Sequence, residues 1–207
     1  MTSHEFSFDA DDVEAGALGF AGAEIVEAYS SVSGPPSIGY YYDESDVDQQ
    51  ANQWRGPNLV GSGEDPVLAR GPSGLLLLYY SVGSLGEGEL EVRNWDVAEH
   101  KFGGATVLTK DPSLFGDEVG SIFWDIVGRV YVVWPGTDAN GNSVMRMWMY
   151  NAVTGSWSSP VDIANISGEY KGPAHIAVYG GQGYVTFQDS EGLEIVSLFP
   201  KIHCDIC

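Results

Sequence analysis

The sequence predicts an all-β fold of repeated four-stranded sheets, and three observations support this prediction. Glycines in the middle of β-rich blocks are separated by 54 and 55 residues, at Gly74, Gly128 and Gly183. Aromatic landmarks recur 55 residues apart, at Trp95 and Tyr150 and again at Phe102 and Trp157. The composition, with 27 glycines and 12% aromatic residues, suits strands joined by tight turns. A repeat of about 40–55 residues made of short strands is typical of a β-propeller blade.

Taken in order, the chain contains about four such units of 54–55 residues, which we expect to form a small β-propeller or a propeller-like array. Residues 1–20 are small and acidic and are interpreted as an N-terminal arm. Residues 21–200 are assigned to the propeller-like domain, and residues 201–207 to a cysteine-containing tail.

Within the domain, two strands are expected after the arm, at 24–30 and 37–43, with a turn containing Gly34 and two prolines between them. Complete units are expected at 65–116 and 119–168, and the last unit starts near 172. The last unit ends before a fourth strand. Pairing with the N-terminal strands would close the ring, and otherwise a partner would have to cover the open edges.

The charge of the chain narrows its possible partners. Twenty-nine acidic residues against nine basic ones give a net charge of −20. Such a surface disfavours nucleic acid, because phosphate contacts need Lys and Arg, and it also disfavours anionic membranes. The longest apolar run, Leu75–Tyr80, is too short to cross a bilayer. We therefore expect protein partners in a homo- or hetero-oligomeric assembly, glycans as candidate ligands, and no nucleic acid or membrane insertion.

The same charge suggests a saline environment, because salt screens the self-repulsion of an acidic protein. An ordinary acidic protein is the alternative. The N-terminus lacks the charged and apolar segments of a secretion signal. We expect a location outside the cell, or on the surface of a virion, that is reached by another route.

Short motifs between residues 55 and 199 resemble the five-bladed glycoside hydrolases of the arabinanase, β-xylosidase and invertase type. Asp65-Pro66 is followed by Gly74 and an aromatic strand, as in the first motif of that family. The resemblance implies that Asp65 is the catalytic base or nucleophile. A turn aspartate before proline is the alternative. In the second motif, around residues 121–131, the family's aspartate position is occupied here by Gly120.

The third motif departs from the family in its most important residue. The family's general acid precedes Gly-Pro, and here Lys171 precedes Gly172-Pro173. Glycoside hydrolysis needs two carboxyl groups, and a lysine does not replace the acid near neutral pH. Glu169 is a weak substitute, because a shift of two residues along a strand moves a side chain by about 6–7 Å. We expect a degenerate site, and we lean towards a protein that is not an enzyme.

Aromatic side chains suggest sugar binding, because a flat ring matches the apolar face of a sugar. From the six tryptophans we take Trp54, Trp124 and Trp134 as candidate ligand contacts, together with Lys171 and His175. Packing between blades is the alternative for the tryptophans.

Calcium is the one candidate cofactor, and no other is expected. Asp138, Asn140 and Asn142 alternate as oxygen ligands do in a calcium loop. Asn140-Gly141 is also a strong hairpin signal, so a simple turn is the alternative. Cys204 and Cys207 lie in the last five residues, where a metal clip, a redox pair, a local disulfide and two plain thiols all remain open.

Three function classes follow. The first is a non-catalytic surface or structural binding protein, built on a propeller within a larger assembly such as a virion, with glycans as candidate ligands. The second is a sugar-binding lectin. The third is a glycoside hydrolase of the arabinanase or xylosidase type with a rearranged acid.

Overall fold

The structure, a computed structural model, describes residues 13–21, 24–31, 36–43, 54–71, 74–82, 88–110, 120–125, 129–151, 153–179 and 182–198. These residues form seventeen β-strands and no α-helix, and no helix that could span a membrane is found among them. The strands make four antiparallel sheets, which we call blades I to IV. The all-β prediction of about four units is confirmed.

Each blade is a run of neighbouring strands in chain order. Blade I contains β1 (Val13–Ala21), β2 (Glu24–Ser31), β3 (Ser37–Asp43) and β4 (Trp54–Ser62). Blade II contains β5 (Glu64–Gly71), β6 (Gly74–Val82), β7 (Gly88–Asp96) and β9 (Thr106–Lys110), and the short β8 (Lys101–Phe102) also pairs with β7. Blade III contains β10 (Ser121–Trp124), β11 (Val130–Thr137), β12 (Ser143–Asn151) and β14 (Val161–Asn165), and β13 (Ser156–Trp157) also pairs with β12. Blade IV contains β15 (His175–Tyr179), β16 (Gln182–Gln188) and β17 (Leu193–Ser197).

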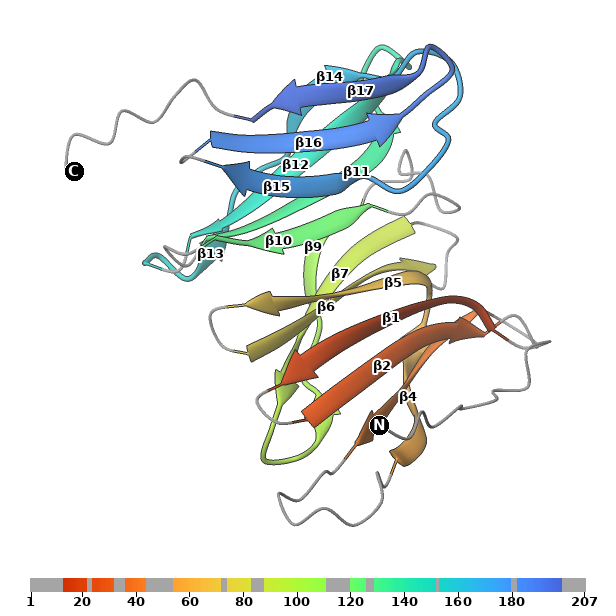
Figure 1. Cartoon of the computed structure of the whole chain (residues 1–207), viewed down its shortest axis with the longest axis vertical. Coiled ribbons are helices and arrows are strands. Elements are labelled where there is room, and N and C mark those ends of the chain that lie inside the picture. The colour runs from red at the N-terminus through yellow and green to blue at the C-terminus, as the bar shows by residue number, and fades with distance from the viewer. Residues whose placement is uncertain are drawn as a thin grey trace, which may run out of the picture.

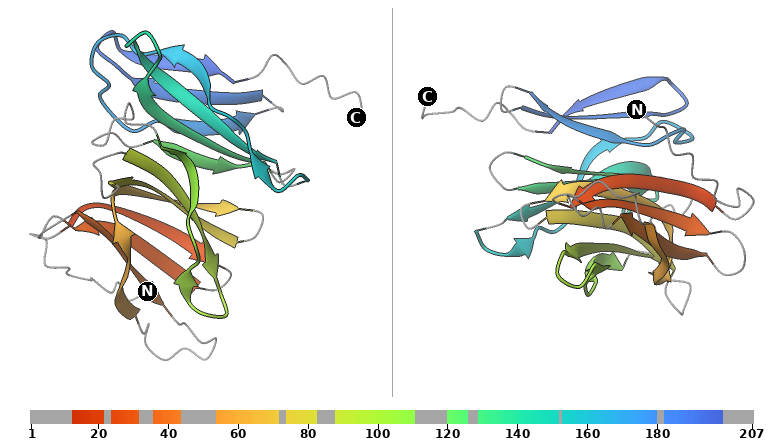
Figure 2. Two further views of the ribbon diagram at one scale, coloured as in Figure 1. Left: turned by 180° about the vertical axis from the view of Figure 1, so that it is seen from behind. Right: turned by 60° about the horizontal axis from the view of Figure 1, so that its bottom comes forward.

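The first strands of the blades follow one another across the molecule in the order β1, β5, β10, β15 (Figure 1). They run in the same direction, and blades I and IV lie at opposite ends of the array (Figure 1). The turned views show the same succession of sheets (Figure 2).

The repeat signals mark equivalent places. Gly74 lies at the start of β6 and Gly183 near the start of β16, so both follow the hairpin turn between the first two strands of a blade. Gly128 lies outside the described residues. The aromatic landmarks are cross-strand pairs, Trp95 with Phe102 and Tyr150 with Trp157.

Two expectations about the N-terminal segment differ from the structure. The segment 13–21 is a full strand, although all of it except the last residue falls within the acidic arm expected at residues 1–20. It pairs with β2 and completes blade I, so these strands are not lent to the last unit. Blade IV has three strands among the described residues.

The core consists of three apolar layers, one between each pair of neighbouring blades. The central strand β6 shows how one strand serves two layers. Leu75, Leu77 and Tyr79 pack towards blade I, and Leu76 and Leu78 pack towards blade III. A strand that is covered on both faces has a continuous apolar sequence, which explains the run at 75–80.

Candidate functional site

Asp65 lies near the start of β5, in the first strand of blade II. The β5–β6 pairing shifts between Glu64 and Val67, which places Asp65 in a β-bulge. Its backbone has a φ of 53°, a left-handed conformation that is uncommon outside glycine. Bulges and such conformations are frequent beside functional sites, because they redirect a side chain.

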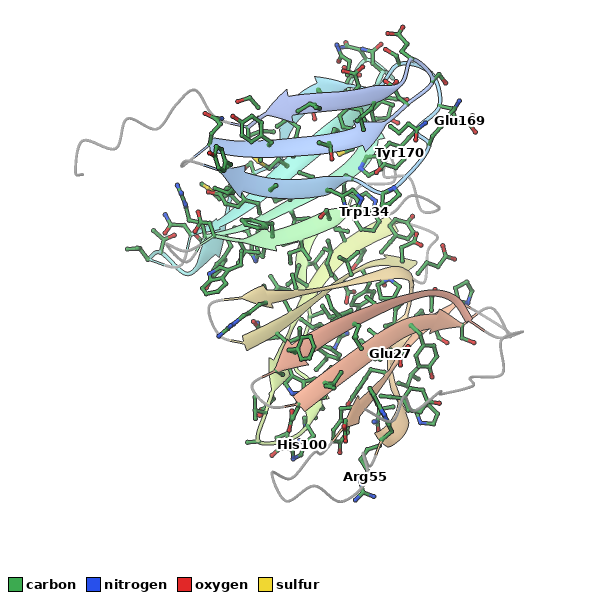
Figure 3. The ribbon with its side chains drawn as sticks, viewed as in Figure 1. Glu27, Arg55, His100, Trp134, Glu169 and Tyr170 are labelled. Carbon is green, nitrogen blue, oxygen red and sulfur yellow. The ribbon has the colours of Figure 1, made fainter. Side chains whose placement is uncertain are left out.

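The loop that carries the third sequence motif lies between β14 and β15. Glu169 is exposed and points outward, whereas the adjacent Tyr170 is buried in blade IV (Figure 3). Lys171 is also exposed, and its backbone N–H donates to the carbonyl of Gln188 at 2.9 Å. The loop is therefore fixed by the buried Tyr170 and by backbone hydrogen bonds, with both charged side chains facing solvent.

Two buried aspartates have structural partners. In the turn after β10, Asp125 accepts hydrogen bonds from the backbone N–H and Nε of Arg129, at 2.9 and 2.7 Å, and from the hydroxyl of Tyr131 at 3.2 Å. Burial, with the Asp125 carboxylate as a further cause, raises the pKa of Tyr131 to about 12. Since β5 and β10 run the same way, Asp65 at the start of one and Asp125 after the end of the other lie at opposite ends of these strands (Figure 1).

The second buried aspartate, Asp189, closes the turn between β16 and β17. Its carboxylate accepts backbone N–H groups from Ser167, Glu191 and Gly192, at 2.8, 2.8 and 3.2 Å. The first of these hydrogen bonds is the largest of the causes that lower the pKa of Asp189. Asp125 and Asp189 are therefore both held in local turns by hydrogen bonds to neighbouring groups. Asp117 and Glu118 lie outside the described residues.

The five candidate ligand contacts are distributed over three blades. Trp54 starts β4 in blade I, Trp124 ends β10 in blade III, and His175 starts β15 in blade IV beside the exposed Lys171. Trp134 is fully buried in the layer between blades II and III (Figure 3). This burial makes Trp134 a core residue rather than a ligand contact. Trp124 is half-buried, with the Arg70 guanidinium 5.8 Å from the centre of its ring.

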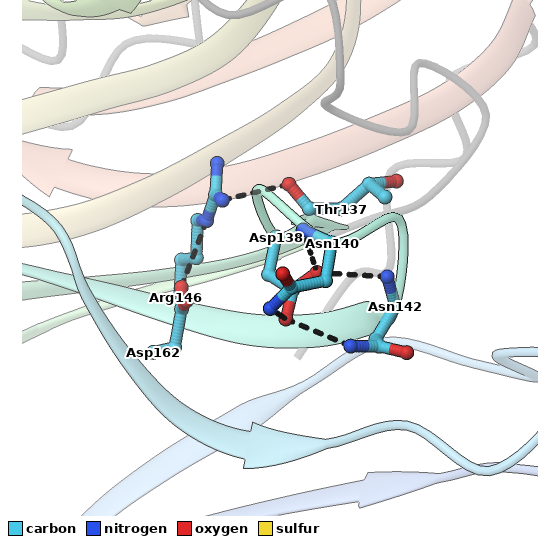
Figure 4. Close-up of polar contacts among 6 residues, drawn as sticks. All are labelled: Thr137, Asp138, Asn140, Asn142, Arg146 and Asp162. Atoms are coloured by element: carbon cyan, nitrogen blue, oxygen red, sulfur yellow. Dashed lines mark hydrogen bonds and ion pairs between the residues drawn. The ribbon is translucent and has the colours of Figure 1, made fainter.

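The loop proposed for calcium is a hairpin between β11 and β12 (Figure 4). The Asp138 carboxylate accepts hydrogen bonds from the backbone N–H of Asn140 and Asn142, both at 2.8 Å, and from the Asn142 side-chain amide at 2.9 Å. These bonds, with the Asn142 side chain as the largest cause, lower the pKa of Asp138 to about 2. Beside the loop, Arg146 bridges Asp162 and the carbonyl of Thr137 (Figure 4).

This geometry is that of a capped hairpin turn. In the described part of the chain, no three His, Cys, Asp or Glu side chains gather as metal ligands do. Calcium at Asp138, Asn140 and Asn142 stays a prediction, and Cys204 and Cys207 lie outside the described residues.

A cluster of polar side chains between blades I and II brings together residues that the sequence analysis did not connect. Glu24 of β2 accepts the Nε1–H of Trp95 at 2.8 Å, and its other carboxyl oxygen lies 2.7 Å from Nδ1 of His100. The His100 ring stacks on Tyr42, with the ring centres 5.2 Å apart. Tyr40 packs edge-on against Trp95 and Phe102, so aromatic rings fill this end of the interface.

The interface between blades II and III is open at Tyr150 and Trp157, the pair that corresponds to Trp95 and Phe102. A cleft of about 180 Å³ lies beside Tyr150 and Trp157 of blade III. Its remaining lining residues are Leu76, Val92, Asn94, Thr106, Val130 and Gly155. The sequence contained one signal for this cleft. The aromatic landmark pair Trp95 and Phe102 recurs as Tyr150 and Trp157, but the tyrosines that cover the first pair, Tyr40 and Tyr42, do not recur.

Comparison with known proteins identifies the architecture. No family model matches the sequence, and no curated protein is similar to it. Among solved structures, the endo-arabinase of Bacteroides thetaiotaomicron VPI-5482 has a TM-score of 0.61 at 12% identity, over 92% of this chain and 76% of that one. The chain has a β-propeller fold.

Two further structures support the same fold. The Hadza microbial sialidase Hz136 has a TM-score of 0.65 at 11% identity, over 91% of this chain and 45% of the sialidase. The RS223 β-xylosidase has a TM-score of 0.53 at 11% identity, over 90% and 74% of the two chains. At these identities the likeness shows the fold, and the resemblance to arabinanase-type proteins is supported at that level.

Proposed function

We propose that this protein is a non-catalytic binding protein, in which a four-blade array acts as a rigid platform within a larger assembly of copies of this chain. The observation that carries the proposal is the exposed apolar face at each end of the array. Leu18, Phe20 and Leu59 on blade I are 60–75% exposed. Tyr179, Leu193 and Ile195 on blade IV are 64–83% exposed.

Each end face is one face of a sheet, and the corresponding sheet faces elsewhere in the array are buried between neighbouring blades. Blades I and II, II and III, and III and IV each pack through such a sheet face. In each of these interfaces, one blade packs against the next blade in the chain. The free face of blade IV and the free face of blade I are the two halves of one more such interface, so blade IV of one copy can cover blade I of the next. Head-to-tail contacts of this kind generate rings or open filaments. Exposed apolar patches mark such interaction sites.

The experiment is native mass measurement of a variant with Leu193→Glu and Ile195→Glu in β17. Because both side chains are exposed, we expect folding to be retained and association to be lost. Val153→Glu is the matched control, since Val153 is 95% exposed on a turn of blade III. Association that survives the double variant, or that the control also abolishes, would contradict the proposal.

The non-catalytic part of the proposal is supported by the carboxyl groups. A glycosidase needs two of them about 5–9.5 Å apart around one bond. Of the described candidates, Asp125 is bound to Arg129 at the other end of the strands, and Glu169 points outward from blade IV. Lys171 occupies the position at which the resemblance implies the general acid.

One observation favours glycoside hydrolysis as a second candidate function, namely the left-handed Asp65 in its bulge. Aryl arabinosides and aryl xylosides test it. We expect no turnover by the purified protein. Turnover that disappears in the Asp65→Asn variant would establish the hydrolase instead.

Glycans are the ligands we propose for the platform, on the outside of a cell or on a virion, in a saline medium. The support is chemical. The surface is too acidic for nucleic acid, and partly buried aromatic rings lie at an open interface between blades.

A further inference from the structure

The cleft between blades II and III differs from the filled interface between blades I and II in two side chains. Tyr40 and Tyr42 of β3 face blade II and pack on Trp95, with ring centres 5.4 and 5.7 Å apart. On the next blade, Val92 and Asn94 of β7 face blade III. Smaller side chains therefore stand where the first interface has two aromatic rings, and Tyr150 and Trp157 are left partly uncovered.

The residues that line this cleft form three regions of different chemistry. Leu76, Val92 and Val130 are buried and form an apolar floor. Tyr150 and Trp157 form an aromatic wall, with ring centres 5.3 Å apart and planes inclined by 51°. The exposed Asn94 and Thr106 supply an amide and a hydroxyl group at the rim.

The size of the cleft suits one ring. A protein cavity of about 150 Å³ holds a benzene molecule. The cleft, at about 180 Å³, therefore has room for one six-membered ring with small substituents. A sugar ring has an apolar C–H face and a rim of hydroxyl groups. The aromatic wall matches that face, and the amide and hydroxyl groups at the entrance match the rim.

We infer that the cleft between blades II and III binds a single pyranose unit, at the end of a glycan or as a free sugar. This inference rests on the proposed glycan-binding function and gives that function a place. Trp157 stacks on the sugar ring, while Asn94 and Thr106 hydrogen-bond its hydroxyl groups. Gly155, at the tip of the hairpin with a φ of 66°, leaves the entrance clear of a side chain.

The test titrates the full chain with the methyl pyranosides of xylose, arabinose, glucose, galactose and fucose, followed by the indole N–H signals in NMR spectra. Trp157→Phe identifies the signal of Trp157. With at least one sugar, we expect a saturable shift of that signal. Asn94→Tyr, which imitates the tyrosine cover of the first interface, should weaken binding at least tenfold. Val161→Ala, in strand β14 of the same blade but outside the cleft, should leave it unchanged.

Thermal melting of each variant shows that a loss of binding is not a loss of folding. Should Asn94→Tyr fail to fold, Trp157→Ala provides the second test, with the same tenfold loss expected. Toluene is titrated in parallel. Saturable binding of toluene at the cleft without any sugar would overturn the assignment of a sugar, and the absence of any saturable shift at Trp157 would overturn the site.

A glycan array separates this inference from the proposed function. Array binding that Asn94→Tyr or Trp157→Ala removes supports both. If array binding persists in both variants, the protein binds glycans elsewhere and the cleft inference fails alone. If the wild-type protein binds neither the array nor any methyl pyranoside, glycan binding and the cleft inference fail together.

Discussion

At the residue scale, two carboxylates in different environments respond to pH in opposite ways. Asp138 is half-buried and accepts hydrogen bonds from Asn142 and Asn140 in its hairpin, which lower its pKa from 3.8 to about 2. Glu27 lies in the apolar face of blade I, where burial raises its pKa above 4.5. In the unfolded chain both groups return to ordinary values, so they affect stability in opposite directions.

For Asp138, the lowered pKa means that its stabilising effect is present above about pH 4 and is lost as the pH falls towards 2. We expect Asp138→Asn to melt below the wild type at neutral pH, with a difference that shrinks over this range. Thermal melts at several pH values measure it. A difference that does not change with pH would mean that the charge of Asp138 has no part in the turn.

For Glu27, the raised pKa means that the ionised form is disfavoured in the folded state, so stability is lost as the pH rises above the ordinary value. We expect Glu27→Gln to raise the melting temperature at pH 7 and to have no effect well below pH 4. Glu191→Gln, on an exposed turn of blade IV, is the control. A fall in melting temperature at pH 7 would refute the burial argument.

At the element scale, the first strands of blades II and III both follow a closely packed glycine. A Cβ on Gly63 would lie 2.6 Å from the Tyr80 carbonyl oxygen and 2.7 Å from the Tyr79 ring. On Gly120 it would lie 2.2 Å from the Val133 carbonyl oxygen and 2.4 Å from the Trp134 ring. The repeat therefore fixes a close approach between the start of the first strand and the second strand.

Gly120→Ala should destabilise the fold by roughly 1–3 kcal/mol, because the added methyl group meets backbone and a buried ring. Gly61→Ala is the matched control within strand β4, since no atom lies within 4 Å of its added Cβ. Chemical denaturation of the two variants measures the difference. Equal stabilities would show that the close approach does not constrain the repeat.

The elements that were predicted from the sequence are those with local signals. The hairpin glycines and the landmark aromatics belong to turns and cross-strand pairs, which a fixed spacing reveals. Strand β1 was missed because 13–21 contains mostly small residues whose partners lie on β2. The burial of Trp134 was only an alternative at the level of sequence, and the cleft beneath Trp157 was not predicted, because both depend on side chains from a neighbouring blade.

At the scale of the whole molecule, net charge opposes compaction and association. A charge of −20 on 22.3 kDa gives strong self-repulsion in dilute buffer. The Debye length falls from about 10 Å at 0.1 M salt to about 3 Å at 1 M, so salt screens this repulsion. We expect the melting temperature to rise between low and molar salt. A flat or falling curve in a calorimetric series would remove the support for a saline environment.

The central claim is that the apolar end faces of the array are covered by other copies of the same chain. Images of single particles in molar salt, averaged in the electron microscope, test it most directly. The account predicts rings or filaments in which blade IV of one copy lies against blade I of the next. Averages that contain only separate four-blade arcs, at high protein concentration as well as low, would contradict it.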